Sequence, residues 1–542
     1  MRKIKQANGR KLIAFSSEHA VILAMGLQKS DLPGLLGLAI RRDNHDGTII
    51  WLEGMLAFPG VTHNPGEPIC SNEAPFQKLY WADYTVRQGR TYTYDVIPVY
   101  GTPGDLDLNE NKALQIEIQT ESDQKDIDHD AHFNRAVVSS QAYSRNFGNV
   151  DPKEDPRILK WLARGLDDMI LKFIAEAKND PDLSLEIAAY HIDHPAIISA
   201  VEGLGSRAQV VLDKEEEPNQ AAIYKFGRSG VDVDFRQKVS NISHNKFIIL
   251  KRRGVPEAVL LGSANFTVSG VSEQNNVCHI IRNRPLADLY SQYWKLLRED
   301  NNSKLHEFNR IWRQPDPNLK IEVNFSPHSK NERIDLDRYI DLIKESGRSR
   351  LFAMFMGTDP EMIRTLTQPE DPHIVVRGLV NDVTSGSNAT EGQVILFHEA
   401  HEKEPAVVAA RPMPSGIDPF LKERPRQWAG TYYLPLVHHK FIVLGFPGPD
   451  AIVITGSANY SKNSTERNDE NTLIVSGNPR IVDMYAGELF RIYEHHRARW
   501  FLSRQSEKPS EQYLETDNTW VTKYTEKTES AKFLQLLLSI EE

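Results

Sequence analysis

Two stretches of the sequence carry the same polar residue types at the same spacing. "HNKFIILKRRGVPEAVLLGSANFT" begins at His244, and "HHKFIVLGFPGPDAIVITGSANYS" begins at His438. Each stretch has His-x-Lys at the start of one apolar run and Gly-Ser-x-Asn at the end of the next. An imidazole can act as a nucleophile or as a proton donor, and ammonium and carboxamide groups can hold anionic oxygens. Together these groups suit the cleavage of a phosphodiester.

The two stretches keep a constant offset along the chain. The matching pairs, each 194 residues apart, are His244 and His438, Lys246 and Lys440, Ser263 and Ser457, and Asn265 and Asn459. Two unrelated turn motifs would rarely match at every polar position. The offset therefore indicates a duplicated α/β unit.

The local pattern places these polar residues on neighbouring strands. His438 and Lys440 stand at i and i+2, so they share one face of a strand. The turn "GFPGPD" leads into "AIVIT", an apolar run typical of a strand at the centre of a sheet. Ser457 and Asn459 follow where that strand ends, and Gly456 is expected to let the backbone approach a ligand. Two copies packed face to face would supply one site with two imidazoles and two cations.

These motifs resemble those of the phospholipase D (PLD) superfamily, which has His-x-Lys, a downstream Asp and Gly-Ser-x-Asn, each present twice. The resemblance covers roughly residues 130 to 505. It implies a bilobal α/β fold with the site at a pseudo-twofold interface, a covalent phosphohistidine intermediate and no metal. By the family pattern, His244 is the nucleophile, and His438 is first the acid and then the base.

The resemblance also covers an acidic residue beyond Gly-Ser-x-Asn, and it has one departure. Glu470 matches the Glu-Asn pair of the family, and the corresponding pair in the first copy is Asn275 with Asn276. The family Asp five residues after the Lys is absent, because Lys251 and Gly445 occupy its two places. That Asp is a supporting group, so its loss is expected to affect positioning rather than the chemistry. Its loss also argues against the true phospholipase subfamily.

Short strand-like runs fill the first part of the chain. Between residues 12 and 120, β-branched and aromatic runs alternate with clusters of Gly, Pro, Asn and Asp, which is typical of strands joined by turns. Tyr92, Tyr94 and Val96 alternate as in a half-buried strand. The stretch "DYTVRQGRTYTYDVIPVYG" resembles the later strands of fibronectin type III domains. Residues 1–122 are therefore predicted to form a fibronectin III-like or Ig-like β sandwich.

A different pattern follows the acidic stretch "ESDQKDIDHDAHFN", which predicts a linker. Strand-like and helix-like runs then alternate, with a helix over 158–177, an irregular segment over 383–433 and a docking helix within "SAKFLQLLLSIEE". The predicted fold class is α/β, with two duplicated PLD-like α/β/α lobes in a bilobal pseudo-twofold unit after the all-β sandwich. The expected boundaries are 123–315 for the first lobe, 316–505 for the second and 506–542 for a C-terminal helical segment.

The composition narrows the class of protein. The chain has 542 residues, a net charge of −10 and two cysteines, Cys70 and Cys278. Two cysteines give no disulfide framework, which fits a reducing compartment. The basic N-terminus lacks the apolar run of a signal peptide, and no apolar run is long enough to predict a transmembrane helix. We therefore expect a cytoplasmic protein that does not bind DNA broadly through its net charge.

Several further polar clusters also have simpler structural explanations. The pairs His129/His132 and His398/His401 have spacings suited to a metal but lack a placed third ligand. The run "EHHRARW" over 494–500 predicts the exposed face of a helix rather than a phosphate patch. Arg252 and Arg253 are predicted to be solvated, but they could also steer a polyanion toward the site. The aromatic residues Trp428, Tyr432 and Tyr433 could pack their loop against the lobe or stack on a base.

The sequence leads to one main hypothesis and two alternatives. The main hypothesis is a phosphodiesterase that uses a phosphohistidine, with nucleic acid as the favoured substrate because no lipid-binding helix is evident. The alternatives are a phospholipase D or transphosphatidylase acting on phospholipid headgroups, and a noncatalytic phosphate-binding module. The site is expected to be complete in one chain and to need no cofactor or metal. The N-terminal sandwich is a candidate for binding a protein partner.

Overall fold

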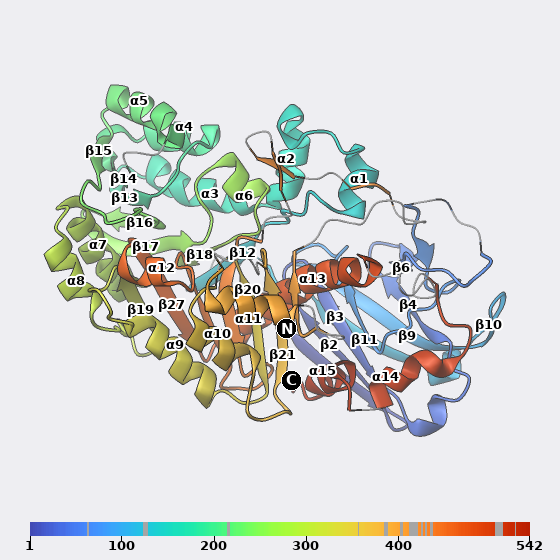
Figure 1. The fold of residues 1–542 in the computed structure, drawn as a ribbon. Coiled ribbons are helices and arrows are strands. Elements are labelled where there is room, and N and C mark those ends of the chain that lie inside the picture. Colours follow the sequence, from blue (N-terminus) through green and yellow to red (C-terminus); the bar gives the residue numbers. More distant parts are fainter. Residues whose placement is uncertain are drawn as a thin grey trace.

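The computed structural model describes residues 1–61, 64, 66–122, 128–213, 217–355, 357–383, 389–400, 405–410, 421–423, 426–428, 431–433, 437–503, 513–525 and 527–541. A β sandwich from the N-terminal part of the chain lies beside two α/β lobes (Figure 1). None of the helices in the described ranges combines the length and the apolar character needed to cross a bilayer.

Two antiparallel sheets form the N-terminal domain. One sheet has the order β1 (Arg2–Ala7), β2 (Arg10–Ser16), β3 (Val21–Gly26), β8 (Tyr80–Asp83). The other has the order β10 (Asp105–Leu108), β9 (Thr91–Thr102), β4 (Gly37–Asp43), β5 (Ile49–Trp51), and β11 (Leu114–Gln119) also pairs with β9. A separate short pair consists of β6 (Glu53–Gly54) and β7 (Ile69–Cys70). Strand β11 packs across the domain on β1 and β2, so the predicted all-β sandwich is confirmed.

A tyrosine near the start of β9 anchors the turn before it. The hydroxyl of Tyr92 accepts a hydrogen bond from the backbone N–H of Arg87 at 2.8 Å. A tyrosine that bonds back to the backbone a few residues upstream is a hallmark of Ig-like sandwiches. Two residues later, the buried Tyr94 donates to Asp83 at 2.9 Å. The Tyr-rich alternation seen in the sequence therefore places these rings inside the sandwich.

The two lobes contain seven-stranded sheets of the same strand order. The first is β12 (His129–Phe133), β18 (Val277–Ile281), β17 (Val255–Gly262), β16 (Lys246–Arg252), β13 (Leu183–Ala189), β14 (Ala208–Leu212), β15 (Asp232–Phe235). The second is β19 (Ile321–Ser326), β27 (Glu470–Ser476), β26 (Ile452–Gly456), β25 (Lys440–Leu444), β20 (Ser349–Met354), β21 (Val375–Val380), β22 (Val407–Ala409). The repeated order confirms the duplicated, bilobal α/β architecture. A short hairpin, β23 (Arg426–Trp428) and β24 (Thr431–Tyr433), lies outside both sheets.

Helices cover the outer faces of both sheets and also lie at their interface. The first lobe contains α1 (Gln141–Phe147), α2 (Pro156–Ala163), α3 (Leu166–Asn179), α4 (Pro195–Glu202), α5 (Gln220–Ser229), α6 (Val268–Ser272), α7 (Arg284–Arg298) and α8 (Asn302–Asn309). The second contains α9 (Ile334–Glu345), α10 (Pro360–Thr367), α11 (Glu391–Glu399), α12 (Lys462–Glu466) and α13 (Pro479–Ser503), and α14 (Thr522–Thr525) and α15 (Glu529–Leu538) follow. Helices α7 and α13 begin at equivalent places, after β18 and β27, the last strand of each repeat in chain order.

Three sequence predictions about these elements were wrong in detail. The helix predicted over 158–177 is two helices, because Arg164 and Gly165 adopt left-handed conformations with φ of 50° and 96°. The predicted linker ends in β12, which pairs with β18 in the first sheet. The segment expected to be irregular contains α11 and β22, the last strand of the second sheet. Pairing across the sheet determines both strands, and a local pattern does not show it.

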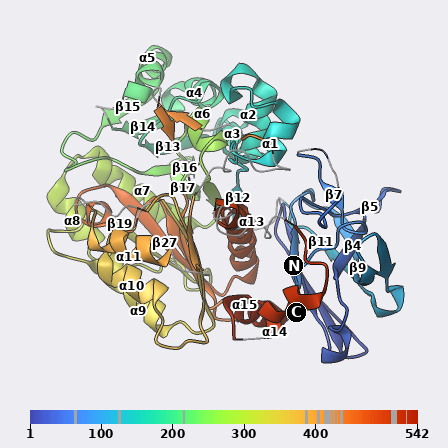
Figure 2. The same ribbon diagram turned by 45° about the vertical axis from the view of Figure 1, so that its right-hand side comes forward.

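Helix α13 joins the two parts of the molecule. It packs on β20, β21 and β22 of the second lobe and on β2 of the sandwich, and it runs between them in the turned view (Figure 2). His496, Arg499 and Trp500 are buried, so the prediction that 494–500 form an exposed face was wrong. The docking helix predicted near the C-terminus is α15, which packs on β2, β3 and β21. Lys11 Nζ donates to the Leu538 carbonyl at 2.7 Å.

The glycine that ends β26 has a packing role. A Cβ on Gly456 would lie 2.2 Å from the Asn471 carbonyl oxygen, and its φ of 148° disfavours any side chain. At the equivalent Gly262, a Cβ would lie 2.1 Å from the Val277 carbonyl oxygen. Backbone of the neighbouring strand, rather than a ligand, therefore makes the close approach that was expected at Gly456.

We expect Gly456→Ala to lower the free energy of unfolding by about 2–3 kcal/mol, because the strand must shift to relieve the clash. Chemical denaturation of the full chain would measure it. The matched control is Gly227→Ala on α5, where a Cβ meets nothing within 4 Å, and it should be neutral or slightly stabilising. Equal stability of Gly456→Ala and wild type would contradict the packing role.

Candidate active site

A hydrogen bond between the lobes holds the first motif histidine. Nδ1 of His244, just before β16, lies 2.8 Å from Oε2 of Glu470, the first residue of β27 in the other lobe. The backbone N–H of His244 also donates to the Asp469 carbonyl at 3.0 Å. Because both contacts cross the lobe interface, the ring direction of His244 depends on the second lobe. With Nδ1 engaged, Nε2 is the nitrogen left for chemistry.

The second motif histidine has the pseudo-twofold equivalent of this contact. Nδ1 of His438 lies 2.8 Å from Oδ1 of Asn276. Asn276 precedes β18 and stands 194 residues before Glu470, so a carboxamide replaces the carboxylate in this half. The pairing of Asn275 with Glu470 predicted from the sequence is therefore wrong by one residue. The offset shared by the histidines was the signal that would have identified Asn276.

The two motif serines hold these supporting groups in place. Ser263 Oγ donates to Asn276 Oδ1 at 2.8 Å, and it accepts the Val277 N–H at 3.1 Å. Ser457 Oγ accepts the Asn471 N–H at 3.0 Å and hydrogen-bonds to Glu470. Both serines are completely buried. The structure therefore places each hydroxyl behind the group that contacts a histidine.

The two motif lysines are buried beside their own histidines. Lys246 donates to the His244 carbonyl, and Lys440 Nζ donates to the His438 carbonyl at 2.8 Å. Each lysine is only 1% exposed. Both ammonium groups therefore lie beside the backbone of the histidines, where they can contact an anionic group bound between the lobes.

Aromatic rings line each half-site. The ring of Tyr190 lies 5.1 Å from that of His244, and the ring of Phe355 lies 5.0 Å from that of His438. Lys246 and Lys440 also lie over these two aromatic rings, at 5.4 and 5.3 Å. Both aromatic residues follow equivalent strands, β13 and β20, and exclude water from the histidines. The sequence reading missed them because they lie outside the repeated motif.

The motif asparagines have free side-chain oxygens. Among the described residues, Oδ1 of Asn265 and Oδ1 of Asn459 are buried without a hydrogen-bond partner. Buried polar groups are normally paired, so a partner from outside the chain fits these positions. Each asparagine lies just beyond the end of β17 or β26, the strand that pairs with the one beginning at the motif lysine.

Burial of the charges dominates the electrostatics of the site. Burial lowers the pKa of Lys246 to about 7, and burial together with the charge of Lys246 lowers the pKa of Lys440 well below its usual range. Burial also lowers the pKa values of His244 and His438 well below normal, and each histidine feels the lysines of both lobes. The two histidines and the two lysines therefore lie close to one another at the lobe interface. Burial raises the pKa of Glu470 to about 7, so the empty site is short of negative charge.

An ion pair across the interface secures this arrangement. Arg236 Nε lies 2.8 Å from Asp469 Oδ2, and both side chains are fully buried. The Asp469 N–H donates to the Ile242 carbonyl at 3.1 Å. The pair fixes the segment that precedes His244 against the residue that precedes Glu470.

A family comparison matches the same parts of the chain. The family profile described as "Cardiolipin synthase, PLD-like domain" matches residues 170–298 and 339–493, together just over half of the chain. The chain belongs to the phospholipase D superfamily. Both matched segments include one His-x-Lys and one Gly-Ser-x-Asn of this PLD-superfamily protein.

Individual relatives are more distant. A phospholipase D of Rickettsia conorii is 29% identical over 127 residues, which is 23% of this chain and 61% of the relative. The match thus spans about three-fifths of the length of that relative. The solved phosphatidylserine synthase of Haemophilus influenzae is 12% identical, and the match covers 70% of this chain and 94% of that protein with a TM-score of 0.42. Nuc of Salmonella typhimurium, a PLD family member, is 20% identical, and the match covers 31% of this chain and 92% of that protein with a TM-score of 0.22.

The two positions of the missing family Asp have other roles in this PLD-superfamily chain. Lys251 forms an ion pair with Glu186 on the adjacent strand β13. Gly445 begins a turn with a φ of 76°. Neither position supplies a carboxylate, so Glu470 is the acidic group that contacts a motif histidine.

The other polar clusters singled out in the sequence lie apart from the site. Arg252 pairs with Asp180, and the exposed Arg253 pairs with Asp182. His129 bonds to His279 at 2.8 Å. Of the remaining residues, His398 lies on α11 outside any metal-like cluster of described residues, His401 lies outside the described residues, and the side chains of Trp428, Tyr432 and Tyr433 are not described.

We expect Lys246→Met to raise the free energy of unfolding by about 1–3 kcal/mol at neutral pH, because it removes one of two buried ammonium groups and leaves Lys440 with Glu470. The folded pKa of Lys246 is about 7, below the usual value of about 10.4 for an unfolded lysine. As the pH rises from about 7 to about 10.4, the free energy of unfolding of the wild type should therefore increase. The stability advantage of Lys246→Met over the wild type should shrink over the same range. Thermal unfolding across this pH range measures it.

The control for this prediction is Lys462→Met, at a lysine whose side chain is 70% exposed. It should change stability by less than about 0.5 kcal/mol at any pH. A Lys246→Met chain that is less stable than wild type at pH 6 would contradict the cost assigned to the buried ammonium.

Proposed function

We propose that the protein is a phosphodiesterase that works through a covalent phosphohistidine. The observation that carries the proposal is the pair of equivalent contacts, His244 with Glu470 and His438 with Asn276, each at 2.8 Å between Nδ1 and an oxygen. In both halves a supporting oxygen engages Nδ1, which leaves Nε2 as the nitrogen for chemistry, and Lys440 Nζ lies 3.2 Å from Nε2 of His438. Two imidazoles oriented in this way can act as the nucleophile and the acid on opposite sides of one phosphorus atom.

The reaction balances with these two residues and one water. His244 Nε2 attacks phosphorus, the bond to the leaving oxygen breaks, and that oxygen takes a proton from His438. Water then attacks the phosphohistidine, gives its proton to His438 and releases His244. The phosphorus remains in the same oxidation state throughout, and the net change is hydrolysis of one P–O bond.

The different partners of the histidines support this division of roles. The carboxylate of Glu470 increases the electron density on His244 and stabilises the cation formed when its ring carries phosphorus. The neutral amide of Asn276 orients His438 without stabilising its protonated form as strongly. A less stabilised imidazolium is a better proton donor. We therefore propose His244 as the nucleophile and His438 as the acid and base.

The remaining motif residues would stabilise the transition state. The ammonium groups of Lys246 and Lys440 and the amides of Asn265 and Asn459 can hold the nonbridging oxygens, where negative charge accumulates. Their burial strengthens these interactions because little water competes. Ser263 and Ser457 are proposed as positioning residues, since their hydroxyls contact Asn276 and Glu470. All of these groups lie in one chain, so the proposed site needs no second copy.

Nucleic acid is the proposed substrate. Exposed large apolar residues of the described chain, such as Ile49 on β5, Tyr224 on α5 and Ile311 after α8, lie on different parts of the fold, whereas an enzyme acting at a lipid surface needs an apolar patch. The second candidate is phospholipid headgroup hydrolysis or transfer, which the names of the family profile and the Rickettsia relative favour. A noncatalytic phosphate-binding module, a partner for the sandwich and a cytoplasmic location stay predictions.

We expect His244→Ala to reduce kcat on an aryl phosphodiester at least about 10³-fold, because the covalent step is lost. His438→Ala should form the phosphohistidine from a substrate with a good leaving group but hydrolyse it slowly. Rapid acid-free quenching with ³¹P NMR or intact mass detects the trapped adduct.

The matched control is His398→Ala on α11, which should leave kcat unchanged. Background rates that are equal in wild type and in both site variants would favour the noncatalytic module. Assays on single-stranded DNA, RNA and phosphatidylcholine micelles then separate the substrates. Choline release without cleavage of either nucleic acid would overturn the nucleic-acid choice while leaving the catalytic proposal intact.

We expect KM for the diester to rise above pH 7. A bound phosphodiester anion favours the protonated form of Lys246, whose pKa in the empty site is about 7. Above that pH, binding must take up a proton, so the affinity should fall by up to about tenfold per pH unit. Steady-state kinetics from pH 6 to 9 test this, and a KM that is constant over that range would contradict it.

A further inference from the structure

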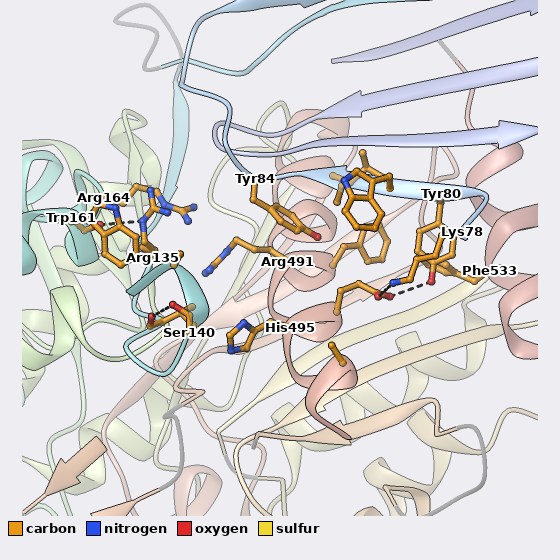
Figure 3. Close-up of a pocket in the computed structure, with 18 residues that line it drawn as sticks. Lys78, Tyr80, Tyr84, Arg135, Ser140, Trp161, Arg164, Arg491, His495 and Phe533 are labelled. Carbon is orange, nitrogen blue, oxygen red and sulfur yellow. Dashed lines mark hydrogen bonds and ion pairs between the residues drawn. The ribbon is translucent and has the colours of Figure 1, made fainter. Parts of the chain in front are cut away.

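A cavity of about 370 Å³ lies between the β sandwich, the first lobe and α13. Its walls come from strand β8 and the residue after it, from the segment around α1, from α2 and from α13 (Figure 3). Aromatic side chains contribute much of the lining, including Trp81, Tyr84, Trp161 and Phe490. The volume falls within the usual range for small-molecule sites. None of the catalytic motif residues lines this cavity.

Three arginines gather at the cavity. Arg135 and Arg164 lie together at one end beside Trp161, and Arg491 points toward them from α13 (Figure 3). Burial and the charge of Arg491 lower the pKa of Arg135 to about 10, and burial with the charges of Arg491 and Arg135 also lowers the pKa of Arg164. All three guanidinium groups are still charged at neutral pH. Their mutual repulsion is therefore present whenever the cavity is empty.

Only one of the three arginines has a carboxylate partner. Arg491 forms a two-pronged pair with Glu488, with both N–O distances at 2.7 Å. Arg135 donates to the Trp161 carbonyl at 3.3 Å and stacks over that indole at 4.2 Å. Within the described ranges, neither Arg135 nor Arg164 forms an ion pair, and Nε of Arg164 is buried without a hydrogen-bond partner. Glu488 and Glu18 also act on Arg164, but neither forms an ion pair with it in the described ranges. Enclosed cations without a paired carboxylate are costly, so this end of the cavity is suited to an anion.

Two further polar atoms at the cavity lack partners in the described part of the chain. They are the hydroxyl of Tyr84 and Nε2 of His495, and both are buried. They lie in the middle of the cavity near Arg491 (Figure 3). At the far end, Lys78 Nζ lies 2.7 Å from Glu494, so the charges there neutralise each other. The positive charge is therefore confined to one end, and the middle offers hydrogen bonds between aromatic walls.

A metal site in the same region is the main alternative. Glu18, His19 and His132 bring three possible ligand atoms within 4.8 Å of one another. However, His132 already contacts Glu18 at 3.1 Å through Nδ1 and the Arg164 carbonyl at 2.8 Å through Nε2. The charges of Arg164 and Arg135 also act on His19. A divalent cation would have to break the His132 contacts and face this positive field, so the geometry favours an anion nearby.

We propose that this cavity binds a small organic phosphate with a planar group, such as a nucleoside monophosphate. Arg135 and Arg164 hold the phosphate, since guanidinium groups bind phosphate oxygens through paired N–H donors. The planar group lies between the aromatic walls, where Tyr84 and His495 contact its polar atoms. The proposal is independent of the proposed catalysis, because it uses none of the same side chains.

Arg491 is unsuitable for a test because it also supports the catalytic region. It donates to the Asn134 carbonyl at 3.4 Å, and Asn134 accepts the N–H of Asn276 at 2.9 Å. Asn276 contacts His438. A change at Arg491 would therefore act on both sites, whereas Arg164 is a cleaner position for substitution.

Binding is measured by isothermal titration calorimetry on the full chain carrying Lys246→Met, so that phosphate uptake at the catalytic site is weakened. The probes are AMP, phenyl phosphate and inorganic phosphate at low salt. We expect AMP, phenyl phosphate or both to bind with a Kd below 100 µM, and inorganic phosphate to bind at least tenfold more weakly. Preference for AMP over phenyl phosphate identifies a nucleotide, and the reverse identifies a simple aryl phosphate.

Arg164→Gln should weaken binding at least tenfold, and Arg253→Gln, at an exposed ion-paired arginine, should leave it unchanged. Tyr84→Phe removes a buried hydroxyl without a partner, so it should fold normally and weaken the binding of AMP at least threefold. The proposal is overturned if no probe binds below 1 mM, or if Arg164→Gln and Tyr84→Phe both bind like the parent chain. Equal affinity for inorganic phosphate would overturn the assignment of a planar group.

Discussion

Two ammonium groups buried between two duplicated lobes are the constraint around which the structure is built. Lys246 and Lys440 are almost inaccessible to water, and burial lowers the pKa of both. Such charges are tolerated only where the surroundings hold them firmly and an anion can neutralise them. The Arg236–Asp469 ion pair and the packed sheets hold the two lobes in a fixed position around these lysines. The empty site is thus complementary to a phosphodiester, because a bound anion would neutralise these buried cations.

The duplication produces a site that is symmetric in shape and asymmetric in charge. Equivalent strands present the histidines, and equivalent serines orient their supporting groups, but Glu470 stands in one half and Asn276 in the other. A carboxylate and a carboxamide are nearly the same size and accept the same hydrogen bond. They differ in charge, so they change the proton affinity of the adjacent ring without changing its position. In the proposed mechanism, this difference allows two identical side chains to take different roles.

The same physical theme recurs where the sandwich meets the lobes. Helix α13 carries charged and aromatic residues into that interface, including Arg491 and Glu494, and the interface encloses a cavity. The sequence predicted an exposed surface there because the run "EHHRARW" is polar. Polarity indicates solvent only when no other domain covers the residue. Here the β sandwich covers it, and ion pairs such as Arg499 with Glu423 compensate part of the buried charge.

The sequence alone determined the duplication, the family, the α/β class and the residue types that meet in the site, because the motifs are local and recur at one offset. Strand alternation likewise predicted the sandwich. Tertiary structure alone decided that β12 and β22 complete the sheets and that Tyr190 and Phe355 enclose the histidines. These contacts join residues far apart in the chain. Their energy depends on burial and distance, which no local pattern of residues encodes.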